Sequence, residues 1–477
     1  MNHGELNVLD LLIIGAYLFS MVGVGVYFAK RIRNTGDYFV GGHSFGPFIL
    51  MATVCATIIG GSGLMGRAGV AYSSGFKAIL TAVPYLLGMF LFSGISGRIS
   101  RVGMKYNITS IPELFEYRFG KTTKVLLAGL IAFTMMGTVA SQVTATATII
   151  NMLGGELGLS YEMGALIATL VFMAYTATSG LFGVVYTDVL QFYMLLIFVY
   201  ILIPSASLFH VGGIRNFVAN LDPGLTQPYI DGSILGDIVT YLVFTMAGAE
   251  MWQRAFAARD DKSAKKGMFL GTSVYGVTIL LVYFMGVVAH QIVGEDVLAQ
   301  YGSTDAVVPA LAIKVLPVGL TGLALAGILS VIMSTADSYL LVSVQSVVRD
   351  IIHTLMPDMR DETEIKLSRV FSIVLPIGAL IIALYIKNAY HILMFAWSFY
   401  AASCGLPAFA ALYWKKVTKQ GILAAMVSGF VVCIGWKIAG QPLGLGAAVP
   451  GTAACAAALI VVSLLTCKRD PSVYLDA

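Results

Sequence analysis

Charged side chains are scarce in this sequence. Asp, Glu, Lys and Arg make up 11% of the 477 residues, whereas a typical soluble domain has about 25%. The net charge is only +4, and the basic residues stand in short loops rather than in one patch. This composition excludes an ordinary soluble surface and does not indicate nucleic acid as a partner.

Cysteine is also rare, and no catalytic pattern is present. The five cysteines lie in or beside apolar segments without metal-ligand spacing, so we interpret them as packing residues. No nucleophile is paired with a general base, and we therefore do not predict an enzyme.

Hydrophobic residues, in contrast, make up 58% of the chain. They form runs that reach the roughly 20 residues needed to cross a bilayer. Thirteen runs have this character, near 8–29, 46–73, 78–98, 124–153, 160–180, 185–206, 235–256, 267–290, 309–349, 368–386, 390–413, 421–438 and 447–467. The sequence therefore predicts an all-α integral membrane protein.

Basic residues predict how these helices are oriented. Lys30, Arg31 and Arg33 follow the first run, which favours a retained helix with its N-terminus outside over a cleaved signal. The other basic clusters then fall in cytoplasmic loops near 98–105, 254–266, 349–369 and 415–419, and the chain ends inside at Lys468 and Arg469. We expect a multi-pass protein of the plasma membrane.

The run 309–349 carries polar side chains in the middle of a spanning helix. Asp337 is the most costly of them, because a carboxylate at the centre of a bilayer helix costs about 3 kcal/mol on insertion scales. Ser334, Thr335 and Ser338 lie beside it, and residues four apart share one helix face. We therefore treat these residues as a candidate functional site, and the simplest partner for their oxygens is a small hard cation.

The second predicted helix is interrupted by glycine. Ala56–Gly63 reads ATIIGGSG, and adjacent glycines at mid-depth weaken a helix and free its backbone groups. A weaker pattern stands in the seventh helix at Gly248, and paired interruptions of this kind indicate the binding site of a transporter. Glycine is also common where membrane helices cross closely. Gly60 and Gly61 can therefore serve either helix packing or a functional break, whereas we interpret Gly248, taken by itself, as a packing residue.

The interruption and the polar helix together predict a cation site. Two hydroxyls and three backbone carbonyls would make a neutral cage, from Ala56, Ile59, Val331, Ser334 and Thr335. Such a cage suits a monovalent ion such as sodium and is too weak for calcium. The alternative is that the hydroxyls bond carbonyls of their own helix, as they often do in membranes.

A second acidic residue leaves a further cation site open. Asp188 lies in the segment GVVYTDVLQF, where the sixth predicted helix begins. It can join Asp337 and nearby hydroxyls around a cation, or it can cap the start of its own helix.

Seven motifs in order give the chain a specific resemblance. They are DYFVGGHSFGPF (37–48), ATIIGGSG (56–63), SIPELFEYRFG (110–120), YTDVLQ (186–191), WQRAFAARDDKSAKKG (252–267), the long AG…MSTADS stretch, and LPAFAALYWKKVTKQG (406–421). Together they cover nearly the whole length. The chain resembles the sodium:solute symporter family, which includes the bacterial proline and pantothenate permeases, the sodium–glucose transporters and the high-affinity choline transporter.

The resemblance implies a fold. This fold is a leucine-transporter-type inverted repeat of 5+5 helices, with an extra N-terminal helix and two extra C-terminal helices. On this basis we divide the chain into the extra helix with a cytoplasmic loop (1–45), the first repeat (46–206), an extracellular loop (207–234), the second repeat (235–413), and the C-terminal helices with a cytoplasmic tail (414–477).

The resemblance also implies ion sites. The principal sodium site of the family falls on Ala56, Ile59, Val331, Ser334 and Thr335. The second sodium site of some members falls on Asp188, Ser334, Asp337 and Ser338. Because Asp337 replaces a serine-type ligand of that second site, the number of coupled ions stays open.

The solute pocket is expected between the two interruptions. We assign to it Gly60, Gly61, Ser62, Gln142, Met246, Gly248, Glu250 and Trp252. Members similar to the proline permease carry an acidic residue at the position of Ile58, and the choline transporter has tryptophans at those of Ile58 and Gly248. An aromatic cage for a quaternary ammonium is therefore not expected.

Three residues near this pocket have two interpretations each. Trp252 contacts the solute or anchors its helix at the membrane interface. Glu250 pairs with a cationic group of the solute or bonds Arg254 one turn on. Arg67 attracts a carboxylate or extends its charge to the interface.

These features predict sodium-coupled import of a small polar organic solute by alternating access. The expected partners are sodium, the solute and the lipid bilayer; a monomer suffices, and the oligomeric state stays open. One rival is a proton-coupled permease that uses Asp337 or Asp188 as the relay. The other is a membrane sensor that binds solute without net transport.

Overall fold

The computed structural model describes residues 7–29, 38–39, 41–154, 159–226, 232–294, 302–467 and 475. Within these residues the protein is all-helical, apart from one isolated parallel bridge between Phe45 and Ala258. The basic residues predicted to follow the first helix (30, 31 and 33) and to end the chain (468 and 469) lie outside the described residues.

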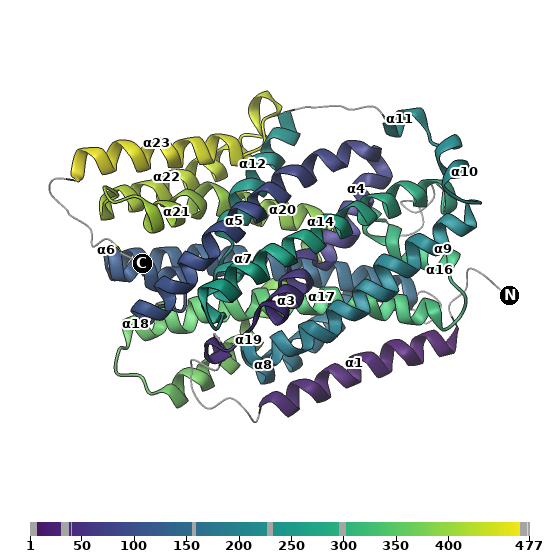
Figure 1. Cartoon of the computed structure of the whole chain (residues 1–477), viewed down its shortest axis with the longest axis horizontal. Helices are drawn as coiled ribbons and strands as arrows, with labels where there is room; N and C mark the ends of the chain where they lie inside the picture. Colours follow the sequence, from purple (N-terminus) through teal and green to yellow (C-terminus); the bar gives the residue numbers. More distant parts are fainter. Residues whose placement is uncertain are drawn as a thin grey trace.

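The bundle in Figure 1 is built from helices of eight residues or more. They are α1 (Val8–Ala29), α3 (Pro47–Ile59), α4 (Arg67–Ser74), α5 (Ile79–Tyr106), α6 (Ile111–Phe119), α7 (Lys121–Leu153), α8 (Tyr161–Met194), α9 (Leu202–His210), α12 (Gly232–Ala247), α13 (Ala249–Ala257), α14 (Asp261–Ile292), α16 (Val307–Val315), α17 (Leu320–Gln345), α19 (Asp361–Tyr385), α20 (Ala389–Tyr400), α21 (Leu406–Tyr413), α22 (Lys419–Ile438) and α23 (Ala448–Thr466). Shorter segments join them, chiefly α10 (Ile214–Ala219), α11 (Pro223–Thr226), α18 (His353–Leu355), and the π-helical turns η2 (Ser62–Gly66), η5 (Leu195–Ile201), η7 (Ser346–Ile352) and η8 (Ala401–Gly405).

Apolar helices occur at all thirteen predicted places. Among the described residues, ten helices are long and apolar enough to cross a membrane, one bent pair forms a further span, and Val8–Met21 and Tyr161–Ala177 are shorter apolar helices. This confirms the all-α membrane class. One boundary is wrong, because the run 309–349 is not one helix: α16 ends at Val315, and the chain turns at Gly319 before α17 begins.

Helix α17 forms the centre of the bundle. All its residues from 324 to 345 are buried, and it contacts α1, α3, α7, α8 and α19. Figure 1 shows it between α3, α7 and α19. A helix enclosed by protein can carry polar side chains that lipid would not tolerate, which explains how the Ser-Thr-Ala-Asp-Ser stretch fits at this depth.

Helix α3 stops inside the bundle. Gly60 has φ 51°, a left-handed value, and the chain resumes in the π-helical turn η2 before α4. The two halves of this span bend by 56°. Gly61 must also be small, because a Cβ there would lie 2.2 Å from Ile332 Cγ1 of α17. The predicted interruption is confirmed, and the same glycines serve both the break and close packing.

A second break lies between α12 and α13. Helix α12 ends at Ala247, and Gly248 has ψ 120° before α13 begins at Ala249. The Ala247 carbonyl accepts a hydrogen bond from the Tyr400 hydroxyl at 2.6 Å. The helix is therefore interrupted at Gly248, and the position is also closely packed, since a Cβ there would lie 2.5 Å from Glu250 Oε1.

The basic loops meet at one end of the bundle, the end that carries α6 and α18 in Figure 1. Contacts between these loops hold that end together: Arg349–Glu113 at 2.7 Å, Arg101–Asp261 at 3.7 Å, and Arg118 to the Trp414 carbonyl at 3.3 Å. The one-sided distribution agrees with the positive-inside pattern. The direction of this end in the membrane stays a prediction.

We expect Gly286→Ala to destabilise the protein, because a Cβ at Gly286 of α14 would lie 2.2 Å from the Ala68 carbonyl oxygen of α4. Overpacking of this kind costs about 1–3 kcal/mol. Thermal unfolding of the purified protein in detergent measures the effect. Gly94→Ala in α5 is the matched control, since nothing lies within 4 Å of the place that a methyl group would take there. Equal melting temperatures for the two variants would contradict the tight α4–α14 contact.

Candidate cation and solute site

The hydroxyls of α17 contact the carbonyls that the broken helix exposes. Ser334 Oγ donates to the Ala56 carbonyl at 2.9 Å and to that of Val331, in its own helix, at 3.0 Å. Thr335 Oγ1 lies 3.4 Å from the Ala56 carbonyl oxygen and 3.2 Å from that of Thr57. All five residues are buried. Ser334 thus bonds a carbonyl of its own helix, as one of the two interpretations expected, and also contacts a carbonyl of the broken helix; the cation cage stays a prediction.

This cluster has the chemistry that sodium requires. Its oxygens are neutral carbonyls and hydroxyls, and the hydroxyl hydrogens can rotate so that the lone pairs face a cation. Ile59, the fifth predicted ligand, is the last residue of α3, directly before the turn at Gly60. In the described part of the chain, no group of three or more His, Cys, Asp or Glu side chains could hold a metal ion. The residues present therefore fit a hard monovalent cation better than a transition metal.

A buried arginine occupies the neighbourhood predicted for a second cation. Arg254 of α13 donates from Nη2 to Ser338 Oγ at 2.7 Å and pairs with Asp188 Oδ2 at 3.3 Å. Its Nε donates to Thr53 Oγ1 at 3.0 Å, and Nη2 also contacts the Thr57 hydroxyl. The guanidinium therefore neutralises Asp188 and joins hydroxyls of α3 and α17 in one network, which we call the Arg254 network.

Two predictions at this place are wrong. Arg254 was assigned to a cytoplasmic loop, but α13 continues to Ala257 and the side chain is fully buried. Helix α8 is kinked at Gly180, where φ is 54°, and the second half of the helix starts before Asp188. Asp188 does not cap that start, because its carboxylate accepts from Thr53 Oγ1 of α3 at 2.5 Å. One feature of the sequence could have indicated that Arg254 belongs to the helix rather than to a loop. It lies four residues after Glu250, and residues four apart share one face of a helix that starts at the break.

Asp337 faces a different neighbour. Its Oδ1 accepts a hydrogen bond from Thr176 Oγ1 of α8 at 2.5 Å, while its buried Oδ2 has no hydrogen-bond partner in the described chain. The four residues predicted for a second cation site are thus divided among three networks. Asp188 and Ser338 belong to the Arg254 network, Ser334 to the carbonyl cluster, and Asp337 to the contact with Thr176.

A small cavity lies at the break of α3. Its volume is about 10 Å³, room for about one water-sized sphere. The residues that line it are Thr57, Ile58, Ile59, Gly60, Ser62, Gly63, Thr138, Gln142, Thr335, Tyr339, Leu393 and Trp397. Gly60, Ser62 and Gln142 were predicted for the solute pocket. Gly61 adjoins it, since its N–H donates to Gln142 Oε1 at 2.9 Å.

The predicted pocket residues of the seventh helix do not line this cavity. These are Met246, Gly248, Glu250 and Trp252. Trp252 is fully buried and its Nε1 donates to the Met246 carbonyl at 3.4 Å, so it neither anchors an interface nor reaches the cavity.

Glu250 lies one side chain away from the cavity. Its Oε1 accepts from the hydroxyl of Tyr339, a lining residue, at 3.4 Å, and its Oε2 has no hydrogen-bond partner among the described residues. Arg254 donates to the backbone carbonyl of Glu250 at 3.2 Å rather than to its carboxylate. The predicted side-chain pair between these two residues is therefore absent from the described contacts.

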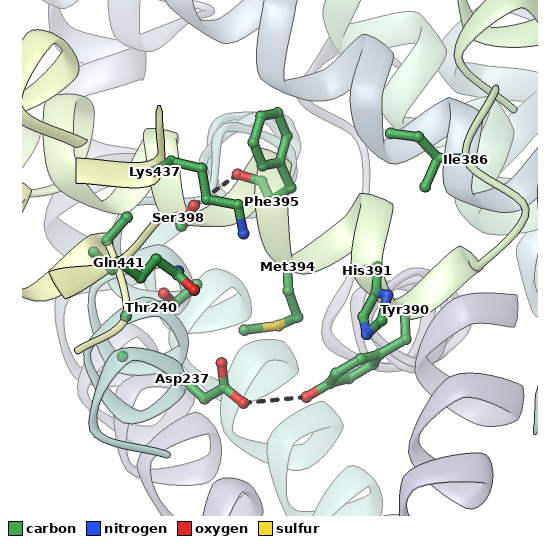
Figure 2. Close-up of a pocket in the computed structure, with 14 residues that line it drawn as sticks. Asp237, Thr240, Ile386, Tyr390, His391, Met394, Phe395, Ser398, Lys437 and Gln441 are labelled. Atoms are coloured by element: carbon green, nitrogen blue, oxygen red, sulfur yellow. Dashed lines mark hydrogen bonds between the residues drawn. The ribbon is translucent and has the colours of Figure 1, made fainter. Parts of the chain in front are cut away.

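A larger cavity of about 500 Å³ lies between α12, α20 and the α22–α23 pair. We call it the vestibule. Figure 2 shows Asp237 of α12 and Tyr390 of α20 joined by a hydrogen bond, with Lys437 of α22 extending into the space. The Tyr390 hydroxyl also bonds that of Tyr241 at 3.1 Å. The described residues thus form a small cavity at the break of α3 and a larger one, with mixed polar and apolar walls, between α12, α20 and the α22–α23 pair.

Comparisons of the sequence identify relatives with transport functions. A model of the sodium:solute symporter family matches residues 38–429. The high-affinity proline transporter PutP of Bacillus subtilis is 29% identical, with 94% of this chain and 96% of that protein covered. The sodium/pantothenate symporter of Escherichia coli is 29% identical over 87% of this chain and 88% of the relative, and the sodium/proline symporter of the same organism is 26% identical over 94% and 91%.

Solved structures share the fold. A Na+-coupled sialic acid symporter in a substrate-bound outward-open state has a TM-score of 0.82 at 20% identity, with 99% of this chain and 100% of that chain covered. Mhp1, a nucleobase-cation-symport-1 family transporter in a closed conformation, has a TM-score of 0.61 at 14% identity over 91% and 95%. These likenesses confirm the leucine-transporter-type fold.

The relatives are transporters rather than enzymes, and they support sodium as the coupling ion and a multi-pass position in the plasma membrane. Both inferences agree with the buried hydroxyl–carbonyl cluster and with the apolar helices of the bundle. The chain belongs to the sodium:solute symporter family.

Proposed function

We propose that this protein imports a small polar organic solute by alternating access, coupled to one sodium ion held between α3 and α17. The observation that carries the proposal is the contact of Ser334 and Thr335 with the Ala56 carbonyl at the break. We expect one copy of the chain to be enough for this activity. The five segments and the outside N-terminus predicted from the sequence stay part of the proposal.

Sodium and solute would act on the same element. Thr335 contacts the carbonyls of the broken helix and also lines the inner cavity. A cation that holds these carbonyls against α17 therefore stabilises one wall of the solute cavity. By linkage, bound solute must raise the affinity for sodium by the same factor.

The Arg254 network supports a single sodium ion. Its guanidinium already supplies a positive charge to Asp188 and hydrogen bonds to Ser338. A second cation at this place would meet like-charge repulsion in a buried environment, where Coulomb energies are large. We therefore assign Arg254 the role of a tethered cation in place of a second ion.

One ion is sufficient for concentrative uptake of a solute without net charge. A membrane voltage of about 100 mV contributes roughly 2.3 kcal/mol per charge, and a tenfold sodium gradient adds about 1.4 kcal/mol. Together these terms support accumulation of roughly several hundredfold at equilibrium.

Ser334→Ala and Thr335→Ala are each expected to raise the sodium concentration for half-maximal effect about tenfold, because a hydrogen-bonding partner of a charged group contributes about 1.5 kcal/mol. Two readouts apply: sodium-induced stabilisation in thermal unfolding, and sodium-driven uptake into proteoliposomes. Solute affinity at saturating sodium should change little.

The matched control is Ser343→Ala, which removes a buried hydroxyl of the same helix that donates to the Tyr339 carbonyl at 3.0 Å, one turn back in that helix. Its sodium dependence should equal that of the wild type. An equal sodium dependence in all three variants would contradict the proposed site. Uptake that follows a proton gradient without sodium would contradict the coupling ion.

The wild-type protein is expected to move one sodium ion per solute. The measurement is the sodium gradient that cancels a fixed solute gradient in proteoliposomes held at zero membrane voltage, which gives the ratio whatever the charge of the solute. Arg254→Met is expected to steepen the sodium dependence, because Asp188 and Ser338 then face an open cation position. The double variant Arg254→Met with Asp188→Asn removes the buried pair as a whole and should return to one ion. A wild-type ratio of two ions would refute the role given to Arg254.

A further inference from the structure

Arg67 is a buried cation without an acidic partner among the described residues. It is the first residue of α4, directly beyond the π-helical turn of the broken span, and only 3% of its surface is exposed. Within the same part of the chain, its guanidinium makes one hydrogen bond, to the Tyr275 hydroxyl, and no carboxylate lies within 4 Å. The buried Nε has no partner there either.

Three tyrosine rings surround the charge instead. The guanidinium carbon lies 4.5 Å from the ring centroid of Tyr85, 4.9 Å from that of Tyr241 and 5.9 Å from that of Tyr275. Each cation–π contact contributes about 0.5–2 kcal/mol, which offsets only part of the cost of a guanidinium at membrane depth. We call these four residues the Arg67 cage; it covers the charge without neutralising it.

The Arg67 cage lies between the two cavities. Toward the vestibule, Tyr241 bonds Tyr390, which Figure 2 shows at the vestibule wall beside Asp237. Toward the break, Trp397 lines the inner cavity, stacks on Tyr85 at 6.2 Å and meets the Tyr241 ring edge-on at 6.1 Å. Two aromatic side chains therefore lie between Arg67 and each cavity: Tyr241 and Tyr390 toward the vestibule, and Tyr85 and Trp397 toward the break.

A comparison with Arg254 shows what Arg67 lacks. Arg254 is bonded to Asp188 and to three hydroxyl-bearing side chains, so this bundle can satisfy a structural arginine fully. Arg67 keeps unused donors and an uncompensated charge. The planar guanidinium fork matches a carboxylate, which can accept two parallel hydrogen bonds from it.

We propose that Arg67 binds the carboxylate group of the transported solute, so the solute class is small organic molecules with a free carboxylate. This inference rests on the proposed transport function and specifies its solute. In this conformation the inner cavity has room for about one water-sized sphere. A bound carboxylate would take space that the rings of Tyr85 and Trp397 now fill between Arg67 and the break.

The test uses a defined mixture of solutes. Proteoliposomes that contain the full chain receive an inward sodium gradient and a mixture of amino acids, monocarboxylates, the amides of both, sugars and vitamins. Mass spectrometry then identifies the solutes that accumulate, with liposomes lacking the gradient as the blank. We expect every accumulated solute to carry a carboxylate and its neutral amide to be left outside.

Variants of Arg67 connect this selectivity to the residue. Arg67→Gln is expected to lower uptake at subsaturating solute at least about tenfold, since a charge-assisted hydrogen bond contributes about 1.5–3 kcal/mol. Arg67→Lys should keep part of the uptake, because lysine preserves the charge but not the fork. Both variants should retain the sodium-induced rise in melting temperature.

Thermal unfolding without solute separates binding from a structural role. Because Arg67 is a buried charge that meets no acidic group in the described chain, Arg67→Gln and Arg67→Met are expected to keep or raise the melting temperature. The matched comparison is Arg118→Gln: Arg118 is also buried, but it donates to the backbone carbonyls of Ala410 and Trp414, both at 3.3 Å. That variant should lose stability.

The outcomes separate this inference from the transport function. Sodium-driven accumulation of solutes without a carboxylate, or unchanged carboxylate uptake by Arg67→Gln, would overturn the inference and leave transport intact. A large fall in melting temperature for both neutral variants would show that Arg67 is structural and would also overturn it. If the wild type accumulates no solute with sodium, the proposed function itself fails, and the inference fails with it.

Discussion

A helix that stops inside a membrane must find new partners for its backbone, and this constraint organises the whole site. Carbonyls freed at mid-depth are costly unless protein or a cavity satisfies them. Here Ser334 and Thr335 of α17 meet the carbonyls of α3, and α17 can carry these hydroxyls because helices enclose it. A hydroxyl can donate to a carbonyl or turn its lone pair to a cation, so one set of atoms serves the states with and without sodium.

The two arginines near the breaks show two ways to bury a cation. Arg254 is part of a closed network whose charges cancel against Asp188. Arg67 is covered by aromatic rings, which attract a cation but leave its charge in place. A buried group that the protein satisfies completely serves the fold, whereas one that it leaves partly unsatisfied behind the wall of a cavity keeps donors that a solute can use.

The parts of the structure that depend on local sequence could be predicted. Spans follow from apolar runs because bilayer thickness sets their length, and the first break follows from Gly60 and Gly61. The missed features depend on contacts between distant segments. Nothing near Gly248 shows that the Tyr400 hydroxyl would take the Ala247 carbonyl, and nothing near Thr176 shows that it would meet Asp337. The break before α17 could have been predicted from the sequence, since Pro317 and Gly319 mark a helix boundary.

The charge balance of the site connects the ion, the solute and the voltage. Arg254 pairs with Asp188, and the protein's own charged groups, Arg67 among them, are present in both the loaded and the empty carrier. The net charge moved per cycle is therefore the charge of sodium plus that of the solute. A solute that is a simple anion then crosses with sodium without net charge, and the membrane voltage does not drive its uptake. A zwitterion keeps the full voltage term of about 2.3 kcal/mol per 100 mV. Glu250 bonds Tyr339 at the cavity and has one oxygen without a partner among the described residues, so it is placed to meet the cationic group of such a solute. The voltage dependence of uptake therefore reports the net charge of the solute that this site accepts.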